Sequence, residues 1–311
     1  MSEQASYRRL LRPTPVFLFL LIGLLAIAAI GAAKPAPIAA KEQMQPRSLR
    51  FGMVAVTDAA SQYRTLLPFA NWLGAQAGLP VEVEIFTDYV SILDAIDHEA
   101  LDIAILTPVV YALCLDDTSL TYLATEVEVE RPFYHSMLIS RKDRIQTGVQ
   151  SLKGARIGFV DRYSASGYLY PAAFLKKAGL IVDGKPQFEA VFLKSHERVL
   201  RALVDGSIDA AASFDNFFVY QQNLPGTSVP VSLKDFRLIK LIEERIPNDA
   251  VVCRTALGKS IIGRLSAALK EYESARKNPK NGLADLWYKR FDLENRSSYE
   301  SVARYLPIEN R

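Results

Sequence analysis

The stretch ARIGFVDRYSASGYLYPAAFLKKAG, residues 155–179, combines one strand, one polar turn and one helix. ARIGFV is a short apolar run of the kind that forms a buried strand, and apolar residues recur at helical spacing after Gly167. Two serines and this glycine separate the two elements. Such a unit is typical of sheets that are covered by helices.

The turn inside this stretch has the chemistry of an anion site. The first turn of a helix leaves N–H groups without partners and carries partial positive charge. Ser164 and Ser166 can add two hydroxyl donors. The same serines can instead cap the helix, with a side-chain oxygen accepting from its N–H groups and nothing bound. The turn alone leaves both interpretations open.

The alternation of strand and helix continues on both sides of this unit. DYVSILDAIDHEA (88–100) and HERVLRALVDG (196–206) have apolar residues at helical spacing. Candidate strands are LRFGMVAV (49–56), PVEVEIF (80–86), LDIAIL (101–106), FEAVFL (188–193) and IDAAAS (208–213). This alternation indicates parallel sheets covered by helices.

Polar residues follow several of these candidate strands. Ligands of open parallel sheets bind beyond the carboxyl ends of the strands, so these residues are candidates for one shared site. Each also has a purely structural interpretation, as a packing aromatic or as a helix cap. Their joint placement at one edge favours a binding site; they are Asp88, Tyr89, Thr107, Tyr111, Ser164, Ser166, His196 and Asp215.

The chain resembles the periplasmic phosphonate-, phosphite- and phosphate-binding proteins of ABC transporters. The resemblance covers roughly residues 48 to 290 as an ordered series of motifs. They are DYVSILDAIDHEALDIAILTPVVY, SLKGARIGFVDRYSASGYLYPAAFLKKAG, SHERVLRALVDGSIDAAASFDN and IPNDAVVCR. It implies a two-lobed type II periplasmic binding protein fold, in which each lobe is a mostly parallel sheet covered by helices. It further implies a non-enzymatic solute-binding protein that captures a small tetrahedral oxyanion in the cleft and delivers it to an ABC transporter permease.

The resemblance also implies which residues meet the ligand. Tyr89 and Tyr111 would come from the first lobe, and the serine turn and His196 from the second. Asp215 matches a position where an acidic residue meets a ligand amine, and Asp249 matches one that contacts the anionic head.

Ala165 departs from the family pattern. The family often has a hydroxyl residue between the two serines, and this chain has alanine there. The backbone N–H of Ala165 remains as a donor. The resemblance therefore supports a small oxyanion more firmly than it supports a phosphonate.

The order of the alternating blocks predicts a discontinuous first lobe. We expect residues 48–132 and 250–311 in lobe one and residues 133–249 in lobe two. The stretch IIGRLSAALKEY, residues 261–272, has an apolar stripe that must be buried, so it should cover the first lobe.

Residues 1–46 have the features of an export segment. Three arginines precede an uncharged apolar run, residues 16–33, and a Pro- and Ala-rich tether follows. The run lies between a long signal peptide and a short membrane span, so cleavage and retention as an anchor both stay open. Either outcome places the folded part in the periplasm, as a monomer that touches the membrane only if the segment is uncleaved.

Composition and spacing argue against several other functions. A net charge of +3 gives no reason to expect nucleic acid. The three histidines lack a metal-ligand spacing, and no cofactor is expected. Ser164 or Ser166 with His196 and either Asp215 or Asp249 has the residue types of a hydrolase, but the pattern G-x-S-x-G is absent.

Two alternative functions and one possible disulfide bond stay open at this point. A retained anchor would favour a membrane-anchored sensor that signals to a partner, and a serine hydrolase is a remote alternative. Cys114 and Cys253 are the only cysteines. They can pair in an oxidising compartment, but their spacing does not tell whether they meet.

Overall fold

The computed structural model describes residues 47–55, 59–128, 130–217, 233–283, 286 and 288–306. These residues belong to one compact unit, Pro46–Arg311. The export segment predicted for residues 1–46 lies outside the described residues. Among the helices in the described ranges, none has the length and apolar character that crossing a lipid bilayer requires.

Helices and short helical turns alternate with strands along the described chain. The helices are α2 (Ala59–Ala77), α3 (Tyr89–Asp97), α4 (Pro108–Leu113), α5 (Tyr170–Lys177), α6 (His196–Asp205), α8 (Gly258–Ala275) and α9 (Tyr299–Ala303). A π-helical turn, η2 (Ala165–Leu169), precedes α5. Turns of 3₁₀ helix are η1 (Val149–Leu152), η3 (Leu233–Asp235), η4 (Thr255–Leu257), η5 (Pro279–Asn281) and η6 (Asn295–Ser298).

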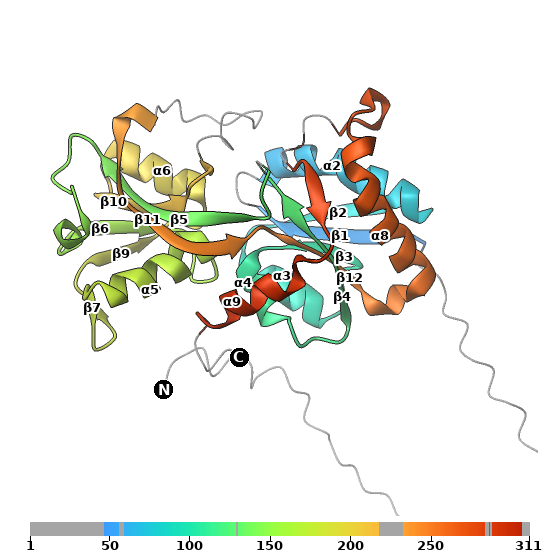
Figure 1. The fold of residues 1–311 in the computed structure, drawn as a ribbon, viewed down its shortest axis with the longest axis horizontal. Coiled ribbons are helices and arrows are strands. Elements are labelled where there is room, and N and C mark those ends of the chain that lie inside the picture. Colours follow the sequence, from blue (N-terminus) through green and yellow to red (C-terminus); the bar gives the residue numbers. More distant parts are fainter. Residues whose placement is uncertain are drawn as a thin grey trace, which may run out of the picture. The chain divides into compact units, whose positions relative to one another are not determined.

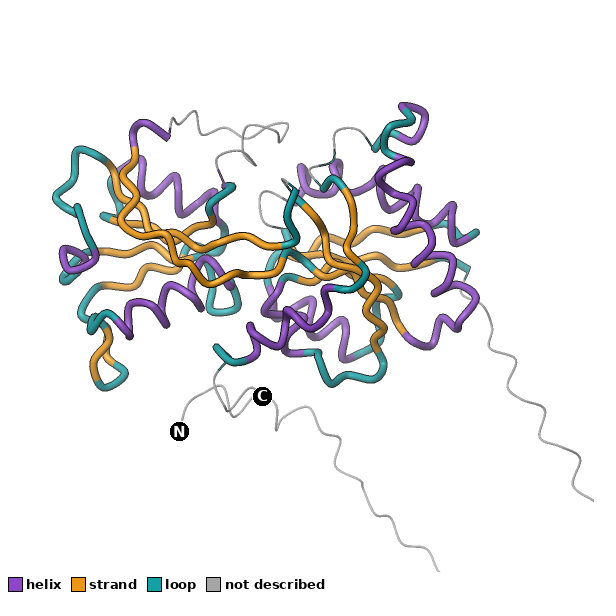
Figure 2. Tube along the Cα trace, in the orientation of Figure 1, coloured by secondary structure: helices purple, strands orange, loops and turns teal. Residues whose placement is uncertain are grey.

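The described strands form two main sheets, each flanked by helices (Figures 1 and 2). The first has the order β13 (Arg290–Asp292), β4 (Leu120–Val127), β12 (Ala250–Arg254), β3 (Ile103–Leu106), β1 (Leu49–Val54) and β2 (Val81–Phe86). The second has the order β11 (Phe236–Pro247), β5 (Phe133–Arg141), β10 (Ala210–Phe214), β6 (Arg156–Phe159) and β9 (Glu189–Phe192). A hairpin joins β7 (Ile181–Val182) to β8 (Lys185–Pro186). We call the two sheets with their helices lobe one and lobe two.

Both sheets are mixed rather than mostly parallel. β1, β2 and β3 pair in parallel in lobe one, as do β6, β9 and β10 in lobe two. The antiparallel pairs involve β4 and β12 in lobe one and β5 and β11 in lobe two. The chain passes from lobe one to lobe two between β4 and β5, and it returns between β11 and β12 (Figure 1). In each sheet one of these strands leads out of the lobe and the other leads in, so the two run in opposite directions. The exact residue limits of the lobes stay a prediction.

The parallel strands of both sheets are held by the same arrangement of an arginine and an aspartate, which we call the frame. Arg50 in β1 donates from its backbone N to Asp102 Oδ2 at 2.9 Å and from Nη2 to Asp102 Oδ1 at 3.2 Å. Arg156 in β6 makes the same two contacts with Asp209, both at 2.9 Å. Such a pair of hydrogen bonds, which we call a fork, fixes the register of two neighbouring strands, because the backbone N–H and the guanidinium of one arginine bind the same carboxylate.

Glycines complete the same frame. A Cβ on Gly52 would lie 2.6 Å from Leu101 Cδ1, and one on Gly158 would lie 2.3 Å from Ile208 Cδ1. Each glycine stands two residues after the arginine, and each apolar residue stands directly before the aspartate. The short stretches RFG and RIG therefore mark equivalent strands of the two lobes.

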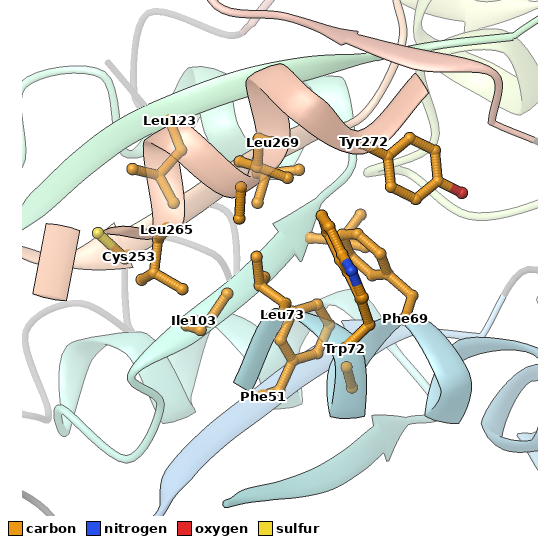
Figure 3. Packing of buried hydrophobic residues seen from close by; sticks show 14 of the residues in the cluster. Phe51, Phe69, Trp72, Leu73, Ile103, Leu123, Cys253, Leu265, Leu269 and Tyr272 are labelled. Carbon is orange, nitrogen blue, oxygen red and sulfur yellow. The ribbon is translucent and has the colours of Figure 1, made fainter. Parts of the chain in front are cut away.

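The largest core lies in lobe one, between the sheet, α2 and α8 (Figure 3). Phe69 is its centre, with the ring of Phe291 stacked at 5.4 Å and that of Tyr272 edge-on at 5.6 Å. Burial of such rings contributes most of the hydrophobic stabilisation of a core. The stripe predicted in residues 261–272 is thus buried against lobe one. Cys253 belongs to this core and Cys114 to its neighbour, and neither forms a disulfide.

The C-terminal helix α9 contacts both lobes. Val302 packs in one cluster with Val109 and Ala112 of α4 and with Leu169 of η2. The ring of Tyr305 stacks on Tyr170 of α5, with centroids 4.3 Å apart. The chain end therefore bridges the lobes beside the strands that cross between them.

Candidate ligand-binding site

A pocket of about 70 Å³ lies where the two lobes meet. It draws residues from the carboxyl ends of strands and from the crossing segments, as the alternating pattern predicts. Seven of the sequence-predicted positions line it: Tyr89, Thr107, Ser164, Ala165, Ser166, His196 and Asp249. The other lining residues are Met53, Pro108, Glu126, Glu128, Tyr134, Phe214 and Asn248.

Ser164 caps the helical turn and also lines the pocket. Its Oγ accepts from the backbone N of Gly167 at 3.1 Å, which makes it the N-cap of η2. Its side chain also lines the pocket, as does that of Tyr89. Capping therefore holds the serine turn in place without removing it from the site.

Gly167 allows the turn to close tightly. A Cβ at this position would lie 2.5 Å from Val160 Cγ2 and 2.7 Å from Ser164 Oγ. Contacts that short do not occur between real atoms, so a side chain would push the turn away from β6. Ser136 secures the turn from β5, because its Oγ donates to the Ser166 carbonyl at 2.7 Å.

Tyr89 and His196 occupy equivalent places in the two lobes. Each is the first residue of the helix after the second parallel strand, α3 in lobe one and α6 in lobe two. Asp88 caps α3 and Ser195 caps α6, each through its side-chain oxygen. Capping at both sites fixes the direction in which the next side chain leaves the helix.

Burial keeps both of these side chains neutral. It raises the pKa of the Tyr89 hydroxyl well above its usual range, so the hydroxyl keeps its proton. It lowers the pKa of His196 to about 3, so the imidazole is uncharged near neutral pH. The His196 Nδ1 lies 3.2 Å from Ser213 Oγ. When Nδ1 accepts from this hydroxyl, Nε2 carries the hydrogen and can donate to a ligand.

Three predicted residues, Asp88, Tyr111 and Asp215, lie outside this pocket lining, and Asp88 caps α3 instead. Tyr111 is 3% exposed and packs edge-on against Tyr299 at 4.8 Å. Asp215 accepts from Arg131 Nη2 at 2.6 Å and from the backbone N of His135 at 3.2 Å, with His135 Nδ1 also at 3.2 Å. Their predicted contacts with a ligand stay predictions.

Glu126 and Glu128 line the pocket, and the sequence analysis did not single them out. Both lie at the end of β4, and alternation along TEVEVE, residues 125–130, places them on the same face. The sequence signal that could have found them is a pair of charged residues on the inward face of a strand. Tyr134, in the next strand β5, was also missed because it follows a crossing segment rather than a parallel strand.

The pocket is acidic. Burial raises the pKa of Asp249 to about 7. Burial, together with the charge of Asp249, raises the pKa of Glu128 to about 8 and that of Glu126 well above its ordinary value. No lysine or arginine is among the described residues that line the pocket. Hydroxyls, backbone N–H groups and a neutral imidazole are therefore the donors available to an anion.

The fold and the pocket define a class of protein, the type II periplasmic binding proteins. A binding protein component of an ABC phosphonate transporter from Pseudomonas aeruginosa superposes with a TM-score of 0.69 at 22% identity, over 84% of this chain and 87% of the other. PhnD1 from Prochlorococcus marinus (MIT 9301), solved in complex with methylphosphonate, gives 0.70 at 20% identity, over 83% and 97%.

Residues 51–299 match the family of ABC transporter, phosphonate, periplasmic substrate-binding proteins, and the chain belongs to this family. The Phosphate-import protein PhnD of Mycolicibacterium smegmatis is 23% identical over 273 residues, which cover 85% of this chain and 83% of that protein. The function inferred from the motifs, an extracytoplasmic solute-binding protein of an ABC transporter, is confirmed. The comparisons give no support to the sensor or hydrolase alternatives.

Proposed function

We propose that the protein captures a small tetrahedral phosphorus oxyanion, of phosphonate, phosphite or phosphate type, and delivers it to its ABC transporter permease. One observation carries this proposal. Six positions matching the family motifs come from separate segments of the chain and line a single pocket.

The donors of the pocket suit such an ion. The Ser166 hydroxyl, the N–H groups of the serine turn and the Tyr89 hydroxyl would hold the oxygens. The neutral His196 would donate from Nε2. Asp249 would accept from a protonated ligand oxygen, because a charged carboxylate beside a dianion is unfavourable. Hydrogen bonds to charged groups each contribute about 1.5 to 3 kcal/mol, so a few of them suffice for tight binding.

Binding would close the two lobes on the ligand. The pocket draws Tyr89 from lobe one and the serine turn from lobe two, so a ligand held by both favours the closed state. We propose that the moving bodies are residues 48–132 with 250–311 and residues 133–249.

The geometry supports a binding role rather than hydrolysis. A Ser-His-Asp triad needs a carboxylate on the Nδ1 of the histidine. The Nδ1 of His196 faces Ser213, and Asp215 is held by Arg131 and His135. Among the described residues, neither serine of the turn forms a hydrogen bond with His196. We therefore assign no catalytic role to this group.

The export segment would determine how the protein meets the membrane. We propose that residues 1–46 direct it to the periplasm and either are removed or hold it at the outer face of the inner membrane. Sequencing the N-terminus of the mature protein distinguishes these outcomes. We further propose that the exported protein acts as a monomer, which sedimentation analysis tests.

Titration calorimetry with phosphate, phosphite, methylphosphonate, 2-aminoethylphosphonate and sulfate tests the proposed function. We expect saturable binding of at least one phosphorus oxyanion, and a smaller radius of gyration in solution scattering at saturation. Sulfate is the control for nonspecific anion binding. Failure of every phosphorus ligand to bind would overturn the proposal.

A further inference from the structure

The C-terminal segment that begins with α9, residues 299–306, packs against both lobes outside the pocket. α9 follows β13 of lobe one along the chain and lies beside α4, which is also part of that lobe (Figure 1). Beyond α9, the ring of Tyr305 stacks on that of Tyr170 in lobe two, with an angle of 27° between the ring planes. The segment therefore belongs to lobe one by its place in the chain and reaches lobe two through its side chains.

An apolar cluster joins the same three parts of the molecule. Val302 of α9 is fully buried and packs in this cluster with Val109 of α4 and Leu169 of η2. Ala165 belongs to the same cluster, so the serine turn is packed against lobe one as well as facing the pocket. Burial of apolar surface between two bodies stabilises the arrangement in which they touch. Protein contacts alone therefore favour the described arrangement of the lobes.

Tyr299 ties the start of α9 to the segments by which the chain crosses between the lobes. Its hydroxyl donates to the backbone carbonyl of Asn248 at 2.6 Å and lies 2.8 Å from Thr125 Oγ1. Asn248 Nδ2 in turn donates to the backbone carbonyls of Glu126 and Arg131, at 3.0 and 3.1 Å. One end of the segment is thus held at both crossings, and its other end reaches lobe two.

These contacts can change affinity without any contact with the ligand. Among the described residues that line the pocket, none belongs to residues 299–306. When only one arrangement of two lobes binds a ligand, the apparent dissociation constant rises as the population of that arrangement falls. Contacts that favour the binding arrangement therefore tighten the binding of every ligand by the same factor.

We propose that residues 299–306 form a strap between the lobes, and that Val302 and Tyr305 are positioning residues for ligand capture. The strap holds the lobes in the described arrangement and so raises the affinity for any ligand that both lobes hold. It acts on the equilibrium between lobe arrangements, whereas the pocket residues act on the ligand itself. The inference uses the lobe closure of the proposed function but depends on no particular ligand.

Small-angle scattering of the unliganded protein tests the strap first. Tyr305→Ala removes the ring that stacks on Tyr170, and we expect a larger radius of gyration than in the parent protein. Tyr305→Phe keeps the ring and should match the parent. At saturating methylphosphonate, Tyr305→Ala and the parent should have the same radius of gyration, because the ligand closes both. An unliganded Tyr305→Ala protein as compact as the parent would overturn the inference.

Titration calorimetry distinguishes the strap from a ligand contact. We expect Tyr305→Ala to weaken the binding of phosphate, phosphite and methylphosphonate by one common factor of about ten, as the loss of a stacked aromatic pair allows. Weakening confined to one ligand would indicate a direct contact and refute the strap. If no phosphorus oxyanion binds to the parent, the proposed function fails, and the unliganded scattering still decides whether the strap exists.

Val302→Ala tests the same interface, and Val182→Ala is its matched control. Val302 is fully buried in the cluster, whereas Val182 is 48% exposed in the hairpin of β7 and β8. We expect Val302→Ala to weaken every bound oxyanion about threefold and Val182→Ala to change none. Equal affinities in these two variants would contradict the inference. Should Tyr305→Ala fail to fold, the unliganded radius of gyration of Val302→Ala decides in its place.

Discussion

The two lobes have the same frame and present opposite chemistry to the pocket. Arg50 with Asp102 and Arg156 with Asp209 hold equivalent strands in register. Beyond these strands, lobe two contributes serines and a neutral histidine, whereas lobe one contributes glutamates from β4. We therefore expect the frame to determine where a ligand lies, and the segments that follow the strands to determine which ligand it is.

The equivalence is closest at the first residues of α3 and α6. Tyr89 and His196 both follow a capping residue, both are buried, and both are neutral donors. The difference is greatest where β4 leaves lobe one, with Glu126 and Glu128, and where β5 enters lobe two, with Tyr134. The crossing strands have no counterpart in the repeated frame, so we expect ligand specificity to depend on them.

The largest effect should come from disturbing the serine turn of lobe two. Gly167→Ala places a Cβ 2.5 Å from Val160 and 2.7 Å from Ser164 Oγ. We expect ligand affinity to fall at least about a hundredfold and the free energy of unfolding to fall by about 3 kcal/mol. Calorimetry and denaturant unfolding measure the two.

Gly263→Ala is the matched control for that substitution. A Cβ at Gly263 meets nothing within 4 Å, and the residue lies inside α8. We expect unchanged affinity and stability equal to or above that of the parent. Unaltered binding in the Gly167 variant would mean that the serine turn does not hold the ligand.

A smaller effect on the free energy of unfolding should distinguish Asp102 from Asp209, the two aspartates of the frame. The Asp102 side chain is 1% exposed and binds both Arg50 and Arg254, whereas that of Asp209 is 17% exposed and binds Arg156. We expect Asp102→Ala to lower the free energy of unfolding by about 3 kcal/mol and Asp209→Ala by about 1 kcal/mol. Urea unfolding of both variants checks this order, and equal losses would show that the forks are energetically alike.

The acidic side of the pocket should make stability depend on pH. The pKa values of Asp249 and Glu128 are raised to about 7 and about 8. In the unfolded chain these groups lose their protons near pH 4. Between this pH and their raised pKa values the folded state therefore binds more protons than the unfolded state. The free energy of unfolding consequently falls as pH rises through this range. The lowered pKa of His196 acts in the opposite direction, but only below about pH 6.5.

The clear window for this test is therefore pH 6.5 to 8.5. We expect a loss of about 1 to 3 kcal/mol over it, of which Glu128→Gln removes part and the exposed Glu273→Gln removes none. The groups facing Glu128 are Glu126, Asp249, Asp215 and Arg131. Denaturant unfolding at a series of pH values measures the slope, and a slope untouched by Glu128→Gln would contradict the assignment.

The smallest effect is expected at Tyr111. Its ring packs against Tyr299 and is absent from the pocket lining of the described residues. Tyr111→Phe keeps that packing, so we expect ligand affinity to change less than about twofold. A tenfold loss in calorimetry would instead support the contact that the family resemblance implies.

The alternating strands and the serine turn were predictable from sequence because they depend on local signals. Apolar runs, helix caps and Gly167 act over a few residues, and they place Tyr89, Ser164 and His196 correctly at the ends of strands. The two-lobed fold followed from the order of the motifs, and the family match confirms it.

Asp249 was predicted from the family motifs, but Glu126 and Glu128 were missed because their place in the pocket depends on contacts between distant segments. Glu126 and Asp249 meet through a backbone hydrogen bond of 3.0 Å between β4 and the start of β12, and no local pattern encodes it. The mixed direction of the sheets was missed for the same reason. Likewise, Asp215 is bound by Arg131 and His135, which lie 84 and 80 residues earlier in the chain.

A crystal structure with bound methylphosphonate would test the proposed pocket most directly. We predict its phosphonate oxygens within hydrogen-bonding distance of Ser164, Ser166 and Tyr89. A ligand bound outside this pocket, or one held by only one of the two lobes, would contradict the account.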